Sequence, residues 1–229
     1  MKYVLILIFF PALSFSQNKE YHFDYLLEYE ITFHKEDISR FKYYLTNSKD
    51  NSYLGIMKET DSLHFELIFK DYDMAYAKVI FLKSDFFEAE YINIECENVS
   101  ENKNIYKYQT KNYDFHILKD TEINSTVYST YKLQSNIKLK KRIRKGIGTN
   151  YYIIDNSTAF HLPILQHPTA YEEWKLNKNL PNGIFYELTF VNPLNERHNS
   201  EILKSYHKID KKVVIVGKCL KPRKFKLPH

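Results

Sequence analysis

The most regular pattern in the chain is a two-residue alternation between residues 21 and 33. Every odd position in this segment is aromatic or aliphatic, and most of the even positions are polar or charged. Successive side chains of a β-strand point to opposite faces, whereas a helix would scatter the same residues around its circumference. The segment therefore predicts a long strand with one buried face and one face in water.

Shorter segments with a similar pattern follow, and clusters of Asn, Asp, Ser and Lys separate them as turns. Residues 40–57 predict a hairpin that turns at residues 47–51. Further strands are predicted at residues 63–70, 77–83, 91–96, 105–109, 113–119, 127–133, 151–154, 184–191, 202–209 and 213–216. This spacing is typical of an antiparallel sheet that curves into a half-barrel or folds into a sandwich. We therefore expect a mainly β protein.

Two segments interrupt this series and predict one or two short helices. Residues 136–146 combine aliphatic residues with many Lys and Arg, and residues 168–176 follow a proline-bounded connector. Thr169 is suited to cap the second helix, which carries Trp174. Docking of this helix on the sheet is the commoner role for such a tryptophan, and sugar binding is the alternative.

The first sixteen residues have the three parts of a secretory signal peptide. Lys2 supplies the positive start, residues 4–13 form an uncharged apolar run, and Ser14 and Ser16 are the small residues of a cleavage site. A membrane-spanning helix needs about 20 apolar residues, which is more than this run provides. We therefore expect export to the periplasm or the cell exterior, with cleavage after about Ser16.

Composition limits the remaining possibilities. The chain has 229 residues, and we expect a signal peptide at residues 1–16, a single β-rich domain at residues 17–217 and a basic tail at residues 218–229. The formal charge of +5 is modest and mixed with acids, so no nucleic-acid partner is expected. Cys96 and Cys219 are the only cysteines in the sequence. They could pair in an oxidising compartment, or Cys96 could be a small buried hydrophobic residue.

The sequence contains no recognisable catalytic, metal-binding or cofactor-binding motif. Gly146-Ile147-Gly148 lacks the third glycine and the strand-to-helix context of a dinucleotide loop. The histidines do not follow metal-ligand spacing, and no Gly-x-Ser-x-Gly sequence occurs. We therefore expect a non-enzymatic protein without catalytic residues, metal ligands or cofactors.

The aromatic face of the first strand is the first candidate binding feature. Its rings could line a cavity for an apolar or lipid-like small molecule. In the alternative, they form the core against a second layer of the protein. The candidate ligand-binding residues are Tyr21, Phe23, Tyr25, Tyr29 and Phe33.

A run of cations is the second candidate feature, because it could bind an anionic surface such as lipid headgroups. The candidate residues are Lys138, Lys140, Lys141, Arg142, Arg144 and Lys145. In the alternative, the aliphatic residues of this segment pack inward and the cations form a solvated face. The aliphatic residues concerned are Ile137, Leu139, Ile143 and Ile147.

Two resemblances extend this interpretation. The short apolar signal segment, Gln17 after it and the high content of Lys, Asn, Ile and Tyr resemble secreted proteins of Bacteroidota-type bacteria. The succession of strands with one helical insertion resembles the half-barrel lipoprotein carriers of the LolA and LppX type. This architectural resemblance implies an envelope protein that holds an apolar or lipid-like ligand in the concave face of its sheet. The alternative is a structural or protein-interaction module of the cell envelope, without a small-molecule ligand.

Overall fold

The computed structural model describes residues 18–73, 75–101, 104, 106–216 and 219 of the chain. The signal peptide expected at residues 1–16 lies outside this part, as does the basic tail except for Cys219. In the part of the chain that is described, no helix has the length and apolar character needed to cross a bilayer.

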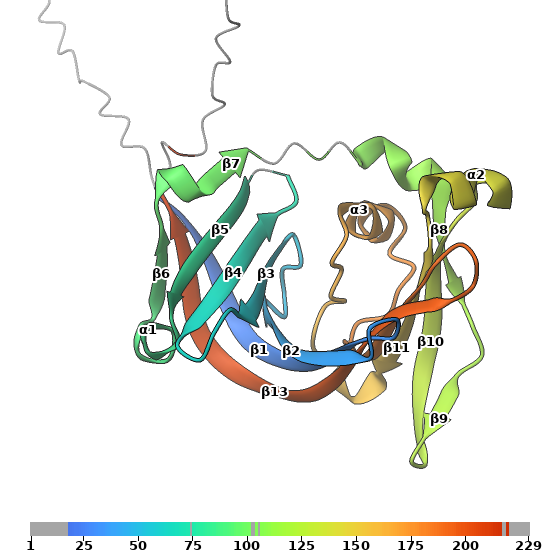
Figure 1. Ribbon diagram of the computed structural model, residues 1–229, viewed down its shortest axis with the longest axis horizontal. Helices are drawn as coiled ribbons and strands as arrows, with labels where there is room; N and C mark the ends of the chain where they lie inside the picture. Colours follow the sequence, from blue (N-terminus) through green and yellow to red (C-terminus); the bar gives the residue numbers. More distant parts are fainter. Residues whose placement is uncertain (1–17, 74, 102–103, 105, 217–218, 220–229) are drawn as a thin grey trace, which may run out of the picture.

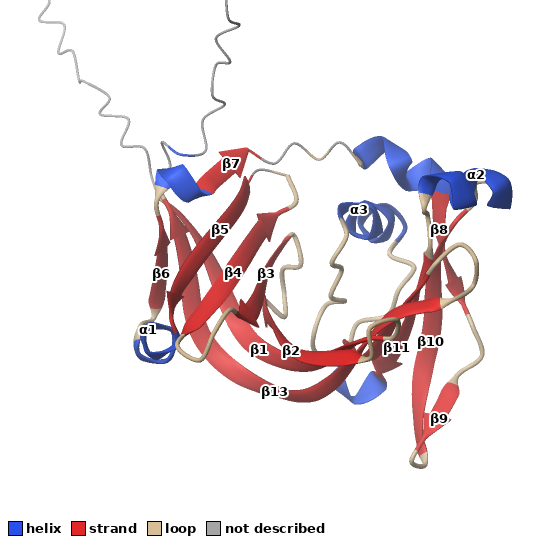
Figure 2. Cartoon of the chain, viewed as in Figure 1, coloured by secondary structure: helices blue, strands red, loops and turns tan. Residues whose placement is uncertain are grey.

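One strongly curved, 13-stranded sheet is the framework of the molecule (Figures 1 and 2). Its main path runs in the order β7-β5-β4-β3-β2-β1-β13-β12-β11-β10-β8, and β6 and β9 pair with β13 and β10. The strands are β1 (Lys19–Phe33), β2 (Ile38–Thr46), β3 (Tyr53–Glu59), β4 (His64–Asp71), β5 (Ala75–Leu82), β6 (Tyr91–Ile94), β7 (Val99–Glu101), β8 (Tyr113–Ile117), β9 (Thr121–Ile123), β10 (Thr126–Ser135), β11 (Thr149–Asp155), β12 (Ile184–Val191) and β13 (Arg197–Ile215). All pairs are antiparallel except β6 with β13, which is parallel. The mainly β, antiparallel and curved fold is therefore confirmed.

The helices are short and lie mostly at the rim of the sheet. They are α1 (Lys83–Glu88), α2 (Leu139–Lys145) and α3 (Pro168–Asn177), with 3₁₀ turns at Cys96–Asn98, Lys107–Asn112 and Asn156–Thr158. The helices predicted at residues 136–146 and 168–176 correspond to α2 and α3, whereas α1 was not predicted. α3 is the exception to the rim position, because it lies in the hollow of the curved sheet (Figure 1).

Two strand predictions need correction. The strand predicted at residues 105–109 is wrong, because residues 107–112 form a 3₁₀ helix. Tyr106 and Tyr108 are exposed there, so the segment has no buried face that a strand would need. The two strands predicted at residues 202–209 and 213–216 are parts of the single long strand β13.

The alternation predicted for β1 is confirmed by burial. Its odd-numbered side chains from residue 21 to residue 31 are all 8% exposed or less. β1 pairs with β13 from Lys19 opposite Ile215 to Phe33 opposite Asn199. The register shifts twice along this ladder, and such irregularities increase the local bend and twist of a strand pair. The long ladder can therefore curve around the interior of the protein.

Two hydrophobic cores lie along the buried face of β1. Tyr21 and Phe23 contact Tyr53 and Phe69 of β3 and β4, with the rings of Tyr21 and Phe69 4.5 Å apart. The next side chains of β1 belong to the second core, which includes α3. Trp174 of α3 is 6% exposed in this core, so the expected role of this tryptophan in docking the helix is confirmed.

His161 ties the segment before α3 to the end of β2. Its ring is 1% exposed, and its Nδ1 and Nε2 atoms lie 2.5 Å from the carbonyl oxygen of Leu162 and 2.8 Å from Oγ1 of Thr46. Since a carbonyl can only accept, Nδ1 donates and Nε2 accepts from the threonine hydroxyl. Burial lowers the pKa of His161 by desolvation, so the buried ring is neutral.

Cys96 and Cys219 form a disulfide, with their Cα atoms 4.9 Å apart. The bridge joins positions that are 123 residues apart in the sequence. The pairing that the sequence left open is therefore present in the structure.

We expect reduction of this disulfide to lower the free energy of unfolding by about 2–4 kcal/mol, because the bridge restricts the unfolded chain. Urea unfolding with and without dithiothreitol measures this difference. The double variant Cys96→Ser/Cys219→Ser is the matched control, because it should unfold like the reduced protein and show no response to the reductant. Equal stability of the oxidised and reduced proteins would contradict the expectation.

We also expect acid to destabilise the protein through His161. The unfolded ring has a pKa of about 6.5 and the folded ring a lower one, so below that pH the unfolded state binds more protons. The contribution of the neutral ring to the free energy of unfolding is thus fully present above about pH 6.5. It decreases as the pH drops further, by at most about 1.4 kcal/mol per pH unit. Urea unfolding between pH 7.5 and pH 5.5 should show this loss.

The variant His161→Gln should lose less stability over that pH interval than the natural protein, although it starts from a lower value. His116→Gln is the matched control, since His116 of β8 is exposed and its replacement should leave the pH dependence unchanged. The same pH dependence in all three proteins would refute the assignment to His161.

Candidate functional site

The aromatic residues proposed from the sequence as ligand contacts lie in the two cores. Tyr21, Phe23, Tyr25 and Tyr29 are buried, and Phe33 is half-buried at the end of β1. The hydroxyl of Tyr29 donates to the carbonyl oxygen of Phe185 at 2.7 Å, so even its polar atom is used internally. A pocket on the concave side of the sheet is open, and none of these five residues lines it.

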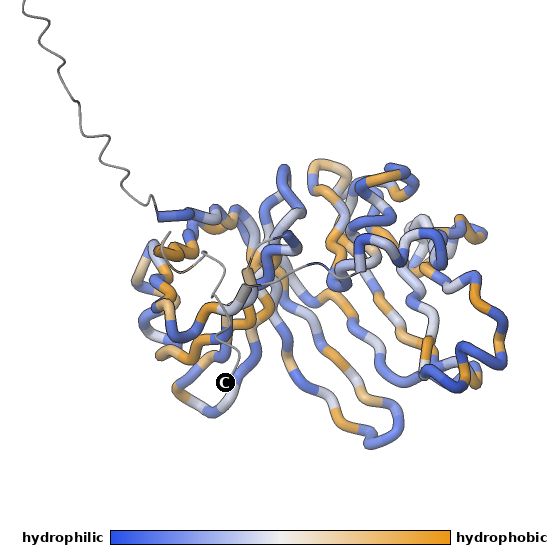
Figure 3. Tube along the Cα trace, turned by 90° about the horizontal axis from the view of Figure 1, so that it is seen from above, coloured by the Kyte–Doolittle hydropathy of each residue, from blue (hydrophilic) through white to orange (hydrophobic). Residues whose placement is uncertain are grey.

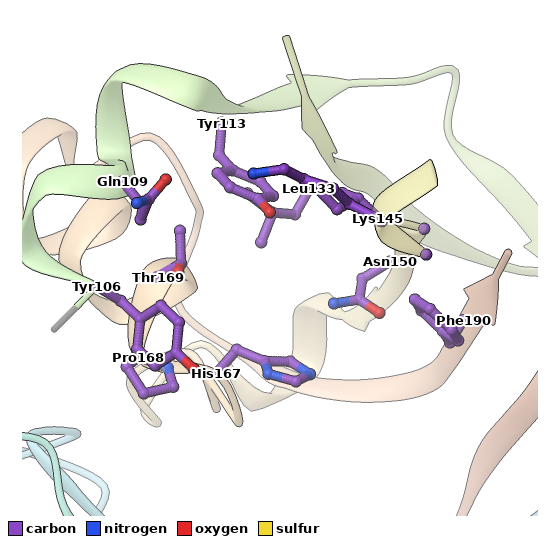
Figure 4. A pocket seen from close by; sticks show the side chains of 13 residues that line it. Tyr106, Gln109, Tyr113, Leu133, Lys145, Asn150, His167, Pro168, Thr169 and Phe190 are labelled. Atoms are coloured by element: carbon purple, nitrogen blue, oxygen red, sulfur yellow. The ribbon is translucent and has the colours of Figure 1, made fainter. Parts of the chain in front are cut away.

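This pocket has a volume of about 430 Å³ and lies between α3, the end of α2 and strands β8, β10, β11 and β12 (Figure 4). Its size falls within the range of small-molecule sites, about 300–1,000 Å³. The residues that line it are Tyr106, Gln109, Tyr113, Leu133, Lys145, Gly146, Ile147, Gly148, Asn150, His167, Pro168, Thr169 and Phe190.

Two glycines shape one wall of the pocket. Gly146 ends α2 in the left-handed conformation (φ 65°), and the next N–H, of Ile147, returns to the carbonyl oxygen of Arg142 at 2.9 Å. At Gly148, an added Cβ would lie 2.3 Å from the carbonyl oxygen of Val191 and 2.4 Å from the ring of Phe190. Only glycine therefore allows the backbone at position 148 to approach β12 this closely. Both glycines are thus explained by the backbone conformation and the packing that their positions require.

The first turn of α3 forms the opposite wall. His167 holds the N-cap position in an extended conformation and makes no side-chain cap hydrogen bond. The expectation that Thr169 caps this helix is therefore wrong, because the helix begins at Pro168, where a missing N–H costs nothing. The free N–H groups at a helix start carry partial positive charge. Figure 4 shows the rings of His167 and Tyr113 and the side chain of Asn150 directed toward the centre of the pocket.

Polar contacts beneath this wall hold the chain that leads into α3. Glu201 of β13 is 3% exposed, and its carboxylate lies 2.7 Å from Nζ of Lys42. The same carboxylate accepts from the hydroxyl of Tyr44 at 2.5 Å and from the side-chain amide of Gln166 at 3.2 Å. Burial, and then Glu201, raise the pKa of Tyr44 well above its usual value, so its hydroxyl remains a donor.

Two lysines, Lys42 and Lys70, lie close enough to the start of α3 for their charges to act on His167. Lys70 of β4 is half-buried and has no ion-pair partner among the described residues. Desolvation, together with the charge of Lys42, lowers the pKa of Lys70. Desolvation and then Lys70 and Lys42 lower the pKa of His167, whose ring is nevertheless accessible from the pocket. An anionic or polar group of a ligand would therefore be favoured at this end of the pocket.

The basic run lies on α2 and at its start, at the rim of the sheet. Five of its cations are exposed, namely Lys138, Lys140, Lys141, Arg144 and Lys145. Arg142 is 9% exposed and donates to Oγ1 of Thr149 at 2.9 Å, so it belongs to the interior. Leu139 and Ile143 are 57% and 44% exposed, which contradicts the alternative that they pack inward. α2 meets the sheet along the side that carries Arg142, and this leaves its aliphatic side in water.

The pocket chemistry is suited to binding. None of the described residues that line it is an Asp, Glu, Ser or Cys, so the lining offers no carboxylate pair and no activated serine or thiol. Among the described residues, no group of three or more His, Cys, Asp and Glu side chains is placed to hold a metal ion. Sequence patterns did not identify this pocket. The features of the sequence that lie in its lining are Gly146, Gly148 and the proline before Thr169.

Comparisons with known proteins find similar structures but no similar sequences. No protein-family model and no curated protein matches the sequence. The fold is similar to MucB in the Pseudomonas aeruginosa MucA/MucB complex, with a TM-score of 0.42, 4% identity and coverage of 84% of this chain and 52% of that chain. The chain thus spans about half the length of that MucB chain.

Two further solved structures are similar over a larger share of their own length. A protein described as an outer membrane lipoprotein-sorting protein domain from Vibrio parahaemolyticus has a TM-score of 0.31 and 9% identity, over 81% of this chain and 85% of that chain. A DUF1329 family protein from Desulfovibrio piger has a TM-score of 0.30 and 9% identity, over 85% of this chain and 87% of that chain. A lipoprotein-sorting domain is thus among the solved structures to which this chain is similar.

Proposed function

We propose that this protein is a non-enzymatic protein of the cell envelope that binds an apolar or lipid-like molecule in its concave pocket. The observation that carries the proposal is the pocket of about 430 Å³ inside the curve of the sheet. Tyr113, Leu133, Ile147 and Phe190 supply apolar wall surface, and a few polar side chains line the walls between them. Ligand sites commonly have this combination, because apolar walls provide affinity and sparse polar groups set orientation.

The distribution of polar groups favours an amphiphilic ligand with an anionic or polar head. His167, Thr169 and the first turn of α3 lie at one side of the pocket, and Lys145 lies on the other (Figure 4). The buried carboxylate of Glu201, which also bonds to Gln166 before α3, is already bonded to Lys42 and Tyr44. A negatively charged head would therefore meet cations and N–H groups, while the apolar part would contact rings and aliphatic side chains.

A structural or protein-interaction module is the second candidate. It is supported by exposed hydrophobic side chains, of which Phe87, Ile117 and Leu176 are more than 60% exposed. These three side chains lie on three separate elements, α1, β8 and α3. Such a module would use its outer surface, and filling the pocket would leave its activity unchanged.

We expect native mass spectrometry of protein purified from its host to show a bound small molecule. We also expect the emptied protein to bind a dansyl-labelled fatty acid, measured by fluorescence titration. Replacing Asn150 by Trp should weaken this binding at least about tenfold, because the indole would occupy the pocket. Thr169→Trp should act in the same direction from the opposite wall.

His116→Trp introduces the same side chain at an exposed position of β8 and should bind the probe like the natural protein. Circular dichroism and thermal unfolding check that each variant is folded. Protein that is always empty and does not bind the probe, or an Asn150→Trp variant with full affinity, would refute the pocket as a ligand site.

A further inference from the structure

The outer side of α2 combines exposed cations with exposed aliphatic side chains. We call this surface the α2 rim and define it by residues 138–141, 143–145 and Leu194. Leu139 and Ile143 are 57% and 44% exposed, and Leu194 in the loop between β12 and β13 is 61% exposed. The five cations of the rim are all exposed.

The aliphatic side chains of the rim are neighbours. Leu139, Ile143 and Leu194 line one shallow hollow of about 400 Å³ that joins α2 to the loop between β12 and β13. Pro193 and Val191 extend its lining. Contiguous exposed apolar side chains of this kind mark an interaction surface more often than scattered ones do.

The cations of the rim are not neutralised by the protein. None of the five has an ion-pair partner among the described residues, whereas Lys58 and Lys78 on the opposite half of the sheet both pair with Glu66. Asp114 accepts from Asn136 at 2.6 Å and Glu196 from Asn192 at 2.8 Å, and no ion pair joins either carboxylate to a cation of the rim among the described residues. These five positive charges equal the net charge of the whole chain, +5.

We propose that the α2 rim docks on the surface of an anionic lipid bilayer, with its cations at lipid phosphates and its aliphatic side chains among the headgroups. Charge complementarity supports this partner, since anionic bilayers attract clusters of Lys and Arg. The aliphatic side chains decide between a bilayer and other polyanions. A nucleic acid or an acidic peptide would satisfy the cations but leave Leu139, Ile143 and Leu194 in water, whereas the boundary of a bilayer accepts both kinds of side chain.

The position of α2 connects this surface to the pocket. Lys145 and Ile147, at the end of the helix, line the concave pocket, while Leu139 and Ile143 face outward. Docking through the α2 rim would therefore bring one wall of the pocket close to the lipid headgroups. This consequence rests on the proposed function, but the docking itself does not.

Flotation with lipid vesicles tests the proposal on the purified mature protein. Vesicles of phosphatidylcholine alone are compared with vesicles that contain about one third phosphatidylglycerol. We expect binding to the anionic vesicles alone, and loss of most binding when the salt concentration rises from about 50 mM to about 500 mM. Lys140→Glu/Lys141→Glu should weaken binding at least about tenfold. Leu139→Ser/Ile143→Ser should also weaken it severalfold, because insertion is lost.

Matched controls carry the same changes elsewhere. Lys35→Glu/Lys208→Glu replaces exposed cations outside the rim, and Leu63→Ser/Ile80→Ser replaces aliphatic side chains that are 63% and 60% exposed. Both controls should bind like the natural protein. All four variants change exposed residues, so thermal unfolding should confirm that they are folded.

Three results would overturn the proposal. The first is no binding of the natural protein to anionic vesicles, and the second is full binding by Leu139→Ser/Ile143→Ser, which would exclude insertion. The third is binding to poly-glutamate without binding to vesicles, which would indicate an acidic protein partner. The Asn150→Trp variant separates the two proposals, because it should still bind vesicles even if it does not bind the fatty acid.

Discussion

The antiparallel ladder between β1 and β13 is the interaction on which the rest of the structure depends. β1 contributes side chains to both cores, as β2 and β3 also do, with Phe23 in one core and Leu27 in the other. Since side chains alternate at every residue, a slip of one position would turn all of these rings to the wet face. The bend of the ladder then determines the hollow in which α3 lies (Figure 1). Figure 3 shows the chain from above, with hydrophobic and hydrophilic residues interspersed along it.

Buried polar contacts determine where the chain enters that hollow. His161 bonds to Thr46, and Glu201 holds Lys42, Tyr44 and Gln166. A buried carboxylate is costly unless its oxygens are hydrogen-bonded, and here each oxygen has a partner. Together these contacts fix the segment before α3 on the sheet. The first turn of α3, and thus one wall of the pocket, takes its position from them.

The two proposed functions use opposite sides of one short helix. Arg142 anchors α2 to Thr149, so the helix has a fixed orientation at the rim of the sheet. Its last residues and Gly146 turn inward to the pocket, while its first residues and Ile143 face outward. A ligand that leaves or enters a bilayer would therefore meet the pocket close to the docking surface. Lys145 belongs to both surfaces, whereas Asn150 lines the pocket alone and Leu139 and Ile143 belong to the rim alone, so substitutions at these three positions alter one surface at a time.

The sequence by itself determined most of the strands and the buried face of β1, because two-residue alternation reports directly which side of a strand is dry. The short strands β7 and β9 were not predicted. The proline-bounded connector and Trp174 indicated α3, although the helix begins at Pro168 and Thr169 does not cap it. Alternation cannot report what covers the dry face, so the rings of Tyr21 and Tyr29 were compatible with a cavity wall as well as with the commoner role in a core. The sequence also left open the pairing of Cys96 with Cys219, the burial of Arg142 and the pocket around His167. Only the tertiary structure decided these, because each depends on contacts between segments far apart in the chain, and local propensity carries no information about such contacts.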